Sequence, residues 1–580
     1  MKTIFSVIMG ICFSSMFAQV GIGTTNPEGA LDITSTNMGL VIPRVPSLEV
    51  LTDGNGNPPV NGTVIYDEFR NKTCFKINGK WACTGFDSTG SIVTEEEIPI
   101  ETNNCTYIKA STPGTSDTFG NLVKMSDDGN YLVVASPDED SNTTGINGDE
   151  TNNSAGSSGA VYVFVKSGAT WSQQAYIKAS NTNSNDYFGI SISITSDGSR
   201  IAVGAYGESS NATGINGDET NNSASFSGAV YVFSRSGTVW SQEAYIKASN
   251  TDSFDYFGNS VSINSDGTRL VSTAYTERSN ATGVNGDETN NALSGAGAAY
   301  VFTRSGTTWS QEAYLKASNT ESGDYFGIHT SISGDGTRIV VGAHNEDSNA
   351  TGVNGNQADN SSTRSGAAYI FSRSGSVWIQ EAYIKASNTG GSDYFGQEVS
   401  LDNDGNTLAI SASSEDSDAT GIDGDETNNL AASSGAVYVF TRTGTSWSQQ
   451  SYMKASNTDS QDFFGRSIQL SSSGDYLLVG ATGEDGYDSG FDGDETNNDV
   501  SGSGAIYLFN RSGSVWSQEH YIKSCNVNIN DSFGSACSID GTGSSIAVGA
   551  PGEDSNAAGI NGNMTDNSLS NSGAVYVLQN

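Results

Sequence analysis

Basic residues are scarce in this chain. Its 580 residues include 26 Lys and Arg against 65 Asp and Glu, which gives a formal net charge of −39. A nucleic-acid-binding protein needs a basic surface, so that class is excluded, and the same charge opposes binding to anionic lipid. A strongly acidic surface instead favours solubility and attracts cations.

Long apolar runs are missing beyond the N-terminus. Residues 1–18 have the pattern of a secretory signal peptide: Lys2 supplies the charge, an apolar run follows, and Ala18 is a small residue before the expected cut. The run is too short for a transmembrane helix, and no later segment could cross a bilayer. The sequence therefore predicts an exported protein, secreted or at the cell surface, without membrane insertion.

Catalytic signals are equally sparse. The three histidines, His329, His344 and His520, show no repeated or paired spacing. A His-Glu-x-x-His motif, a nucleophile elbow and a phosphate-binding loop are all missing. We therefore expect no enzymatic activity. With only nine prolines and 16% charged residues, the composition also argues against wholesale disorder.

Few cysteines follow the signal peptide. Cys74 and Cys83 flank an Asn78-Gly79 turn, and a two-residue turn there places the two cysteines opposite each other. A non-hydrogen-bonded pair has a Cα spacing of about 4.5 Å, which suits a disulfide in an exported protein. An odd set remains, so at least one of its members is unpaired or pairs elsewhere: Cys105, Cys525 and Cys537.

Tryptophan recurs at a fixed spacing. Six tryptophans lie 69 residues apart: Trp171, Trp240, Trp309, Trp378, Trp447 and Trp516. Each unit contains four strand-like stretches, which in the second unit are residues 188–195, 200–206, 228–235 and 241–248. Tight Asp-Gly and Ser-Gly turns join them in pairs, and no stretch has a helical period. Four antiparallel strands per unit, repeated radially, are the plan of an all-β propeller.

A Phe-Gly pair occurs once in each repeat and so indicates the number of blades. It occurs seven times, at Phe119, Phe188, Phe257, Phe326, Phe395, Phe464 and Phe533. The last unit ends at residues 573–578 without a fourth strand, and an unattached strand at 105–110 precedes the first unit. If this N-terminal strand serves as the missing fourth strand of the last unit, it completes that blade and closes the ring. No open sheet edge then remains. Residues 105–580 are therefore predicted to form a seven-bladed β-propeller of four-stranded blades; a string of small β-sandwiches is the alternative.

A Gly-Ala pair follows the second strand in several units, at Gly204-Ala205, Gly342-Ala343 and Gly480-Ala481, and Gly549-Ala550-Pro551 extends it. With the Phe-Gly pairs, these residues resemble the FG-GAP repeat proteins, the family of the integrin α-subunit propeller. The resemblance covers residues 105–580 and implies the propeller fold. It also implies calcium in the loop between the first two strands, but that loop is only Ser196–Gly198 here, so those sites are not carried over.

The segment before the repeats differs from them. Residues 20–33 (VGIGTTNPEGALDI) are similar to a β-rich motif of bacterial surface proteins and phage tail-fibre-like proteins. We expect a small β-rich module or stalk over residues 19–87, through which the chain could form an oligomer. Residues 88–104 carry clustered acids and are expected to be a linker.

The loop between the second and third strands is long, at residues 207–227 in the second unit. Structureless loops of this length are uncommon in compact domains and are usually functional or disordered. One apolar residue recurs in it and is expected to anchor the loop to its blade: Ile146, Ile215, Val284, Val353, Ile422, Phe491 and Ile560.

Acidic residues trade places in this loop. Five units read GDETNN. In the other two units, Asn356 and Asn563 replace the Asp, and Asp359 and Asp566 replace the Asn that stands three positions later. This exchange suggests one shared partner, and calcium prefers such oxygen ligands. The alternative is a network of Asx-turns. The candidate metal ligands are Asp149, Glu150, Asp218, Glu219, Asp287, Glu288, Asp359, Asp425, Glu426, Asp494, Glu495 and Asp566, with upstream acids such as Glu139/Asp140, Glu346/Asp347 and Glu553/Asp554 as further donors.

Other recurrent residues suit structural roles. The tryptophans are expected to pack between outer strands rather than to stack on a sugar. The recurrent Lys and Asp of each unit, such as Lys178 and Asp186, are expected to form salt bridges or to cap turns.

Three function classes remain. The first is a secreted or cell-surface binding or adhesion protein that recognises an extracellular protein or glycan through a propeller with acidic loops, ordered by calcium or by hydrogen bonds. The second is a structural surface or fibre-head component without a specific ligand. The third, a secreted enzyme, would need a unique cluster of acid, base and nucleophile at one blade.

Overall fold

The computed structural model describes residues 105–580 throughout. Before them it describes only the strands β1 (Val20–Ile22), β2 (Leu31–Ile33), β3 (Arg44–Val45), β4 (Val64–Asp67), β5 (Lys72–Ile77), β6 (Lys80–Phe86) and β7 (Ile92–Glu95). The chain divides into two compact units, Met1–Glu101 and Thr102–Asn580. The signal peptide predicted at 1–18 lies outside the described residues. Within them, no helix is long and apolar enough to cross a membrane.

The N-terminal unit is built from short strands. β1 pairs with β2 in parallel, and β3 to β7 form one sheet in sequence order. Cys74 lies opposite Cys83 in the β5–β6 register, as the turn between them predicts. The bond between the two thiols lies outside the described side chains and stays a prediction. β7 falls within the segment expected to be a linker, so the linker is shorter than residues 88–104.

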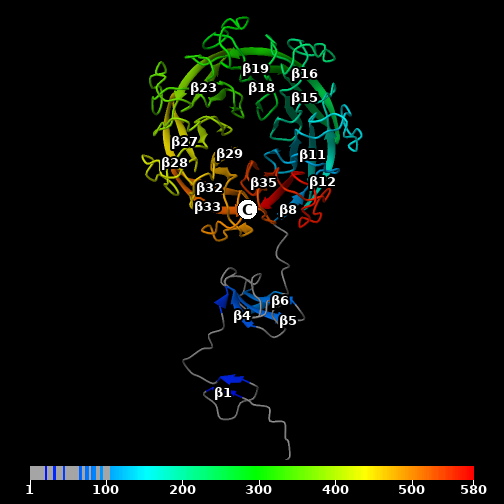
Figure 1. Ribbon diagram of the computed structural model, residues 1–580, viewed down its shortest axis with the longest axis vertical. Helices are drawn as coiled ribbons and strands as arrows, with labels where there is room; N and C mark the ends of the chain where they lie inside the picture. The colour runs from blue at the N-terminus through cyan, green and yellow to red at the C-terminus, as the bar shows by residue number, and fades with distance from the viewer. Residues whose placement is uncertain are drawn as a thin grey trace, which may run out of the picture. The chain divides into compact units, whose positions relative to one another are not determined.

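The C-terminal unit is a ring of seven antiparallel sheets (Figure 1), which confirms the predicted propeller. Blade 1 contains β9 (Leu122–Met125), β10 (Tyr131–Ser136), β11 (Ala160–Ser167) and β12 (Thr170–Ile177); blade 2 contains β13 (Ser191–Ile194), β14 (Arg200–Ala205), β15 (Ala229–Ser236) and β16 (Val239–Ile246). Blade 3 contains β17 (Val261–Ile263), β18 (Arg269–Ala274), β19 (Ala298–Ser305) and β20 (Thr308–Leu315); blade 4 contains β21 (Thr330–Ile332), β22 (Arg338–Ala343), β23 (Ala367–Ser374) and β24 (Val377–Ile384). Blade 5 contains β25 (Val399–Leu401), β26 (Thr407–Ala412), β27 (Ala436–Thr443) and β28 (Ser446–Met453). Blade 6 contains β29 (Phe464–Leu470), β30 (Tyr476–Ala481), β32 (Ala505–Ser512) and β33 (Val515–Lys523), with β31 (Gly490–Phe491) on its outer edge; blade 7 contains β34 (Ala536–Ile539), β35 (Ser545–Ala550), β36 (Ala574–Gln579) and β8 (Cys105–Ile108).

The N-terminal strand closes the ring, as predicted. β8 pairs with β36, with Cys105 opposite Leu578 and Ile108 opposite Val575. The closing strand has four residues, about half the length of the fourth strand in the other blades. It therefore covers only part of the edge that β36 presents.

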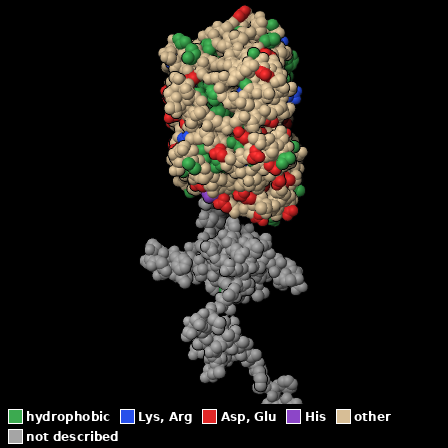
Figure 2. Space-filling view, turned by 90° about the vertical axis from the view of Figure 1, so that its left-hand side faces the viewer, with side chains coloured by type: hydrophobic (Ala, Val, Ile, Leu, Met, Phe, Trp, Pro, Cys, Tyr) green, Lys and Arg blue, Asp and Glu red, His purple; other side chains and the backbone are tan. Residues whose placement is uncertain are grey.

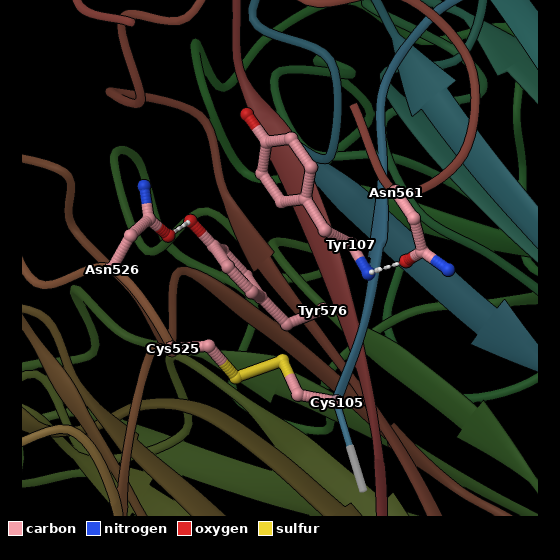
Figure 3. Close-up of a disulfide and its surroundings, with 6 residues drawn as sticks. All are labelled: Cys105, Tyr107, Cys525, Asn526, Asn561 and Tyr576. Atoms are coloured by element: carbon pink, nitrogen blue, oxygen red, sulfur yellow. Dashed lines mark hydrogen bonds between the residues drawn. A yellow bond between two sulfur atoms is a disulfide. The ribbon is translucent and has the colours of Figure 1, made fainter. Parts of the chain in front are cut away.

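A disulfide fastens this seam. Cys105 of β8 bonds to Cys525, which follows β33 of blade 6 (Figure 3). Cys525 occupies the position of Ser180 and Ser456 in other repeats, and at those seams a glutamine side chain bonds to the serine, as from Gln242 to Ser180 at 3.1 Å. The disulfide thus replaces a hydrogen bond with a covalent bond. The third cysteine of this unit, Cys537, is a buried free thiol.

The core lies between neighbouring blades. One apolar cluster joins Val133 and Ile177 of blade 1 to Phe188 and Tyr231 of blade 2, all of them fully buried. The blades approach closely because glycine precedes the third strand: Gly228 has a φ of 80°, and a Cβ there would lie 1.9 Å from the carbonyl oxygen of Phe257 in the next blade. Only glycine fits this contact.

The recurrent tryptophans are buried at the seams, as expected. Trp240 is 4% exposed, and its indole N–H donates to Gln174 of the preceding blade at 2.8 Å. Burial of a large aromatic side chain with its polar atom satisfied stabilises each seam.

A buried ion pair anchors the long loop of every blade. The lysine at the end of the fourth strand meets a glutamate at the start of the loop in seven pairs: Lys109–Glu553, Lys178–Glu139, Lys247–Glu208, Lys316–Glu277, Lys385–Glu346, Lys454–Glu415 and Lys523–Glu484. Salt bridging by the lysine was expected, but its partner is this glutamate. The recurrent Asp186 instead accepts the backbone N–H of Asn183 at 2.7 Å, which is turn capping.

The buried aspartates at this position of the seven blades give the fold a pH dependence. Burial raises the pKa of each to about 7: Asp117, Asp186, Asp255, Asp324, Asp393, Asp462 and Asp531. Between pH 4 and pH 7 the folded state therefore binds protons that the unfolded state has released, so stability falls as pH rises through this window. His344 and His329 oppose this trend, because burial lowers the pKa of both, that of His344 to about 4, but they are two groups against seven.

We expect the melting temperature to be several degrees higher at pH 5 than at pH 8. Scanning calorimetry at both pH values measures the difference. Asp186→Asn, which removes the ionisation but keeps the shape, should raise the melting temperature at pH 8 and leave it nearly unchanged at pH 5. A melting temperature that rises from pH 5 to pH 8 would contradict this assignment.

Candidate functional site

The long loops lie against their own blades. The recurrent apolar residue of each loop pairs with the fourth strand, for example Ile215 with Ile246, and in blade 6 the pairing forms β31. Asn216 beside it accepts the N–H of Tyr245 at 3.0 Å. The predicted anchor is confirmed, and the loop is an extra, irregular edge on the blade.

The aspartates of these loops close their own turns. Asp218 accepts both the backbone N–H of Thr220, at 3.0 Å, and its hydroxyl, at 2.7 Å; Asn221 accepts the same two groups of Ser223 at 2.9 and 2.7 Å. These bonds hold the pKa of exposed Asp218 below its usual value. Where the types are exchanged, Asp359 accepts Ser361 in the same way. The two positions therefore form two successive Asx-turns and do not face a shared protein group.

The glutamates of the loops point elsewhere. Glu219 accepts the hydroxyl of Ser180, from the preceding blade, at 2.7 Å, and Glu288 and Glu426 repeat this contact with their own neighbours. The upstream glutamates belong to the buried lysine pairs. The upstream aspartates cap the loop backbone, as when Asp347 accepts the N–H of Arg364 at 2.7 Å.

The acids of one loop thus serve separate partners. In the part of the chain that the structure describes, no group of three or more His, Cys, Asp or Glu side chains is placed to hold a metal ion. The donor set predicted for calcium does not converge within a blade, and calcium binding stays a prediction. Figure 2 shows the acidic side chains dispersed over one side of the propeller, with few basic ones among them.

The strands nearest the axis enclose a cavity of about 480 Å³, which is lined by the first strand of every blade. At the end where the hairpin turns lie, main-chain hydrogen bonds link successive blades, from Asp127 N–H to the Ser196 oxygen and from Ser196 N–H to the Ser265 oxygen. Asn403 and Ser265 also bond across this end at 2.6 Å. These contacts narrow the channel at the hairpin end; we call the opposite end, where the Phe-Gly pairs lie and the long loops begin, the mouth of the channel.

The polar groups inside the channel break the repeat symmetry. The Nε2 atom of His329 lies 3.2 Å from Glu398, and its Nδ1 accepts the N–H of Val399 at 3.4 Å. Burial lowers the pKa of His329 and raises that of the Cys537 thiol to about 11. Both ring nitrogens are engaged and the thiol is protonated, so these residues do not form an activated nucleophile with its base.

Aromatic side chains line the mouth of the channel over blades 2 to 5. They alternate between the residue before each Phe-Gly pair and the residue after the second strand, and we call them the aromatic arc: Tyr187, Tyr206, Tyr256, Tyr275, Tyr325, His344 and Tyr394. Each ring contacts the next, with centroids 5.2–6.0 Å apart. All seven are half-buried, and Tyr206 and His344 line the cavity itself.

The backbone beneath the arc is strained. Tyr187, Tyr256, Tyr325 and Tyr394 have φ between 53° and 58°, a left-handed conformation that bulky residues rarely adopt. Blade 6 places Phe463 there with a φ of 56°, and blades 1 and 7 place the small residues Thr118 and Ser532 there with a φ of 55°, so all seven blades share this conformation. Such strain persists at sites where the surrounding structure imposes it, and these are often functional.

Sequence analysis missed this arc. The signal was present, because Tyr precedes Phe-Gly in four units and an aromatic residue follows the second strand in three. These aromatic residues stand at positions where the repeats differ from one another, and the sequence alone does not show that both positions reach the channel.

Comparison with known proteins shows two similarities along the chain. A family model described as the FG-GAP repeat matches residues 171–233, 240–302, 309–371, 378–440 and 447–509, which together exceed half of the chain. A model described as the phage tail like trimerisation region matches residues 21–93. No curated protein matches the chain.

Solved structures include similar β-propellers. The β-propeller domain of Cps50 (Swd1) from Myceliophteria thermophila is 7% identical with a TM-score of 0.44, and the match covers 81% of this chain and 97% of that one. The periplasmic gluconolactonase PpgL from Pseudomonas aeruginosa is 12% identical with a TM-score of 0.38, with 77% and 93% covered.

Proposed function

We propose that this chain, which belongs to the FG-GAP repeat family, is a secreted or cell-surface adhesion protein without enzymatic activity, whose ligand binds at the mouth of the central channel. The family and the fold support a binding or structural role in general. One observation favours binding: a half-buried aromatic residue precedes the Phe-Gly pair in blades 2 to 6 but not in blades 1 and 7, and only over blades 2 to 5 do such residues form the continuous aromatic arc. A ring with a purely structural role has no need of a one-sided row of half-buried aromatic residues in contact with one another.

The N-terminal region extends this proposal. Because residues 21–93 are similar to a phage tail like trimerisation region, we include trimer formation in it. Three propellers on one assembly would bind a surface multivalently, which raises avidity by about 10²- to 10⁴-fold without new contacts. This arrangement suits an adhesion protein, and it also suits the alternative role of a fibre-head component.

Binding to immobilised glycans and extracellular-matrix proteins tests the proposal. The purified full chain is expected to have the molar mass of three chains by light scattering and to bind at least one class of ligand. Replacing Tyr256 and Tyr325 by alanine should weaken that binding tenfold or more, because aromatic residues dominate binding energies at buried contacts.

Tyr487→Ala is the matched control. Tyr487 is 56% exposed and lies on a long loop outside the arc, so this variant should bind like the wild type. Absence of any binding, or equal binding by all variants, would contradict the proposal and favour a structural role.

A further inference from the structure

A ring of hydroxyl groups surrounds the channel below its mouth. Ser193 accepts the N–H of Ile263 in the next blade at 3.0 Å, and four further serines make the same contact with their own neighbours: Ser262, Ser331, Ser400 and Ser538. Among the described residues, none of these five hydroxyls donates a hydrogen bond. Their hydrogens are therefore free for an acceptor in the cavity that they line.

Lysine and glutamine occupy the two remaining positions of this ring. Lys124 donates to the Gln469 amide oxygen at 2.5 Å, and it forms no salt bridge with a described residue. This contrasts with the seven buried lysines of the blades, each of which has a glutamate. Glu398 also faces the channel, 3.2 Å from His329, and its charge acts on Lys124 without a direct ion pair between the two. The Lys124 ammonium thus lacks a direct ion-pair partner among the described residues, and a bound anion would supply that contact.

The hydroxyl groups of the aromatic arc are free as well. Those of Tyr187, Tyr206, Tyr256, Tyr275 and Tyr325 make no hydrogen bond to another described residue, and all five rings are half-buried. Each therefore offers an apolar ring and a polar tip at the channel mouth. A sugar, which has apolar C–H faces and a rim of hydroxyl groups, matches that combination better than an extended peptide does.

The dimensions suit a short ligand. The ring formed by the five serines, Lys124 and Gln469 lies three residues along the first strand from the channel mouth. At the usual rise of a β-strand this separation is about 10 Å. A cavity of about 480 Å³ falls within the range of small-molecule sites. One or two sugar units could therefore reach from the aromatic arc to Lys124.

From these contacts we infer that the channel binds the end of an acidic oligosaccharide, with its carboxylate at Lys124 and the serine ring and its sugar rings against the aromatic arc. The inference rests on the proposed function, since it names the ligand class of the same site. The carboxylate accepts hydrogen bonds from the serine ring and Lys124, and the tyrosine hydroxyls bond the sugar rim.

The experiment uses the full chain on an array of immobilised oligosaccharides terminated by uronic or sialic acid, each beside the neutral sugar that differs only in the carboxyl group. A glutamate tripeptide provides the carboxylates without the sugar. We expect binding to acidic sugars, with at least tenfold weaker binding to their neutral counterparts and to the peptide. Lys124→Gln should lower affinity for the acidic sugar by about 10- to 100-fold, as expected for loss of a charge-assisted hydrogen bond.

Lys166→Gln removes the same charge from β11 of blade 1, outside the residues that line the channel, and should bind normally. Lys124→Arg should recover part of the affinity, and the melting temperature of each variant shows that it is folded. Equal binding of neutral sugars, preference for the peptide, or an unchanged Lys124→Gln variant would overturn the inference while leaving the adhesion proposal standing. Loss of binding to every glycan and matrix protein would instead overturn the proposed function.

Discussion

Replacing Glu208 by alanine is expected to destabilise the propeller by about 3–5 kcal/mol, because it breaks a buried ion pair by removing one partner. Glu208 accepts Lys247 at 2.7 Å, the hydroxyl of Tyr245 at 3.0 Å and the N–H of Ser210 at 3.1 Å, and both charged side chains are fully buried. Alanine leaves a buried ammonium without a counter-charge and frees the start of the long loop. The midpoint of urea unfolding measures the loss.

Two comparisons isolate the buried charge. Asp475→Ala breaks the pair with Arg511, in which Asp475 is 53% exposed, and should cost less than about 1 kcal/mol. Replacing Glu208 by Leu together with Lys247 by Met removes both charges and should recover most of the lost stability. If Glu208→Ala costs no more than Asp475→Ala, the pair does not anchor the loop.

Removing the disulfide is expected to destabilise the ring by about 2–5 kcal/mol. Cys105 and Cys525 are 420 residues apart, so the bond restricts nearly the whole propeller in the unfolded state. It also holds the short closing strand, which makes only part of the usual fourth-strand contacts. We expect a lower melting temperature for Cys525→Ser and for the reduced wild-type protein.

The repeats supply the matched variant. Cys105→Gln with Cys525→Ser restores the residue types that bond across other seams, as Gln242 and Ser180 do, so it removes only the covalent link. Cys537→Ser is the control for the loss of a buried cysteine outside the bond. A melting temperature of the Gln-Ser variant equal to that of the wild type would show that the hydrogen bond suffices.

The propeller could be predicted because its signals are local and repeated. Alternation, Asp-Gly turns and the Phe-Gly pair identify the strands, and seven copies leave little ambiguity about the architecture. The missing fourth strand of blade 7 and the extra strand at Cys105 predicted closure, which the β8–β36 register confirms. The Cys105–Cys525 bond was not predicted, although Cys525 stands where other repeats have Ser.

The candidate site was harder to predict, for a physical reason. The acidic residues of the long loops suggested a metal site, yet Asp218 and Asn221 accept hydrogen bonds from neighbouring backbone groups and do not face a common partner. The channel gathers one strand from each blade, so Lys124 meets Gln469 across 345 residues of sequence. Only the ring geometry brings such residues together, and nothing local in the sequence reports it.

The narrowing at the hairpin end of the channel would determine which part of a polysaccharide the proposed site can bind. A polymer that entered the mouth would meet the hydrogen bond between Ser265 and Asn403 at the hairpin end, and it would have to leave through the mouth again. At the proposed glycan site, threading would thereby be disfavoured, and recognition would be of chain termini rather than of internal segments. For a glycan coat, the number of binding places would then scale with the count of chain ends and not with total mass. Trimming enzymes that create new ends would increase attachment, whereas capping the ends would abolish it without shortening a single chain.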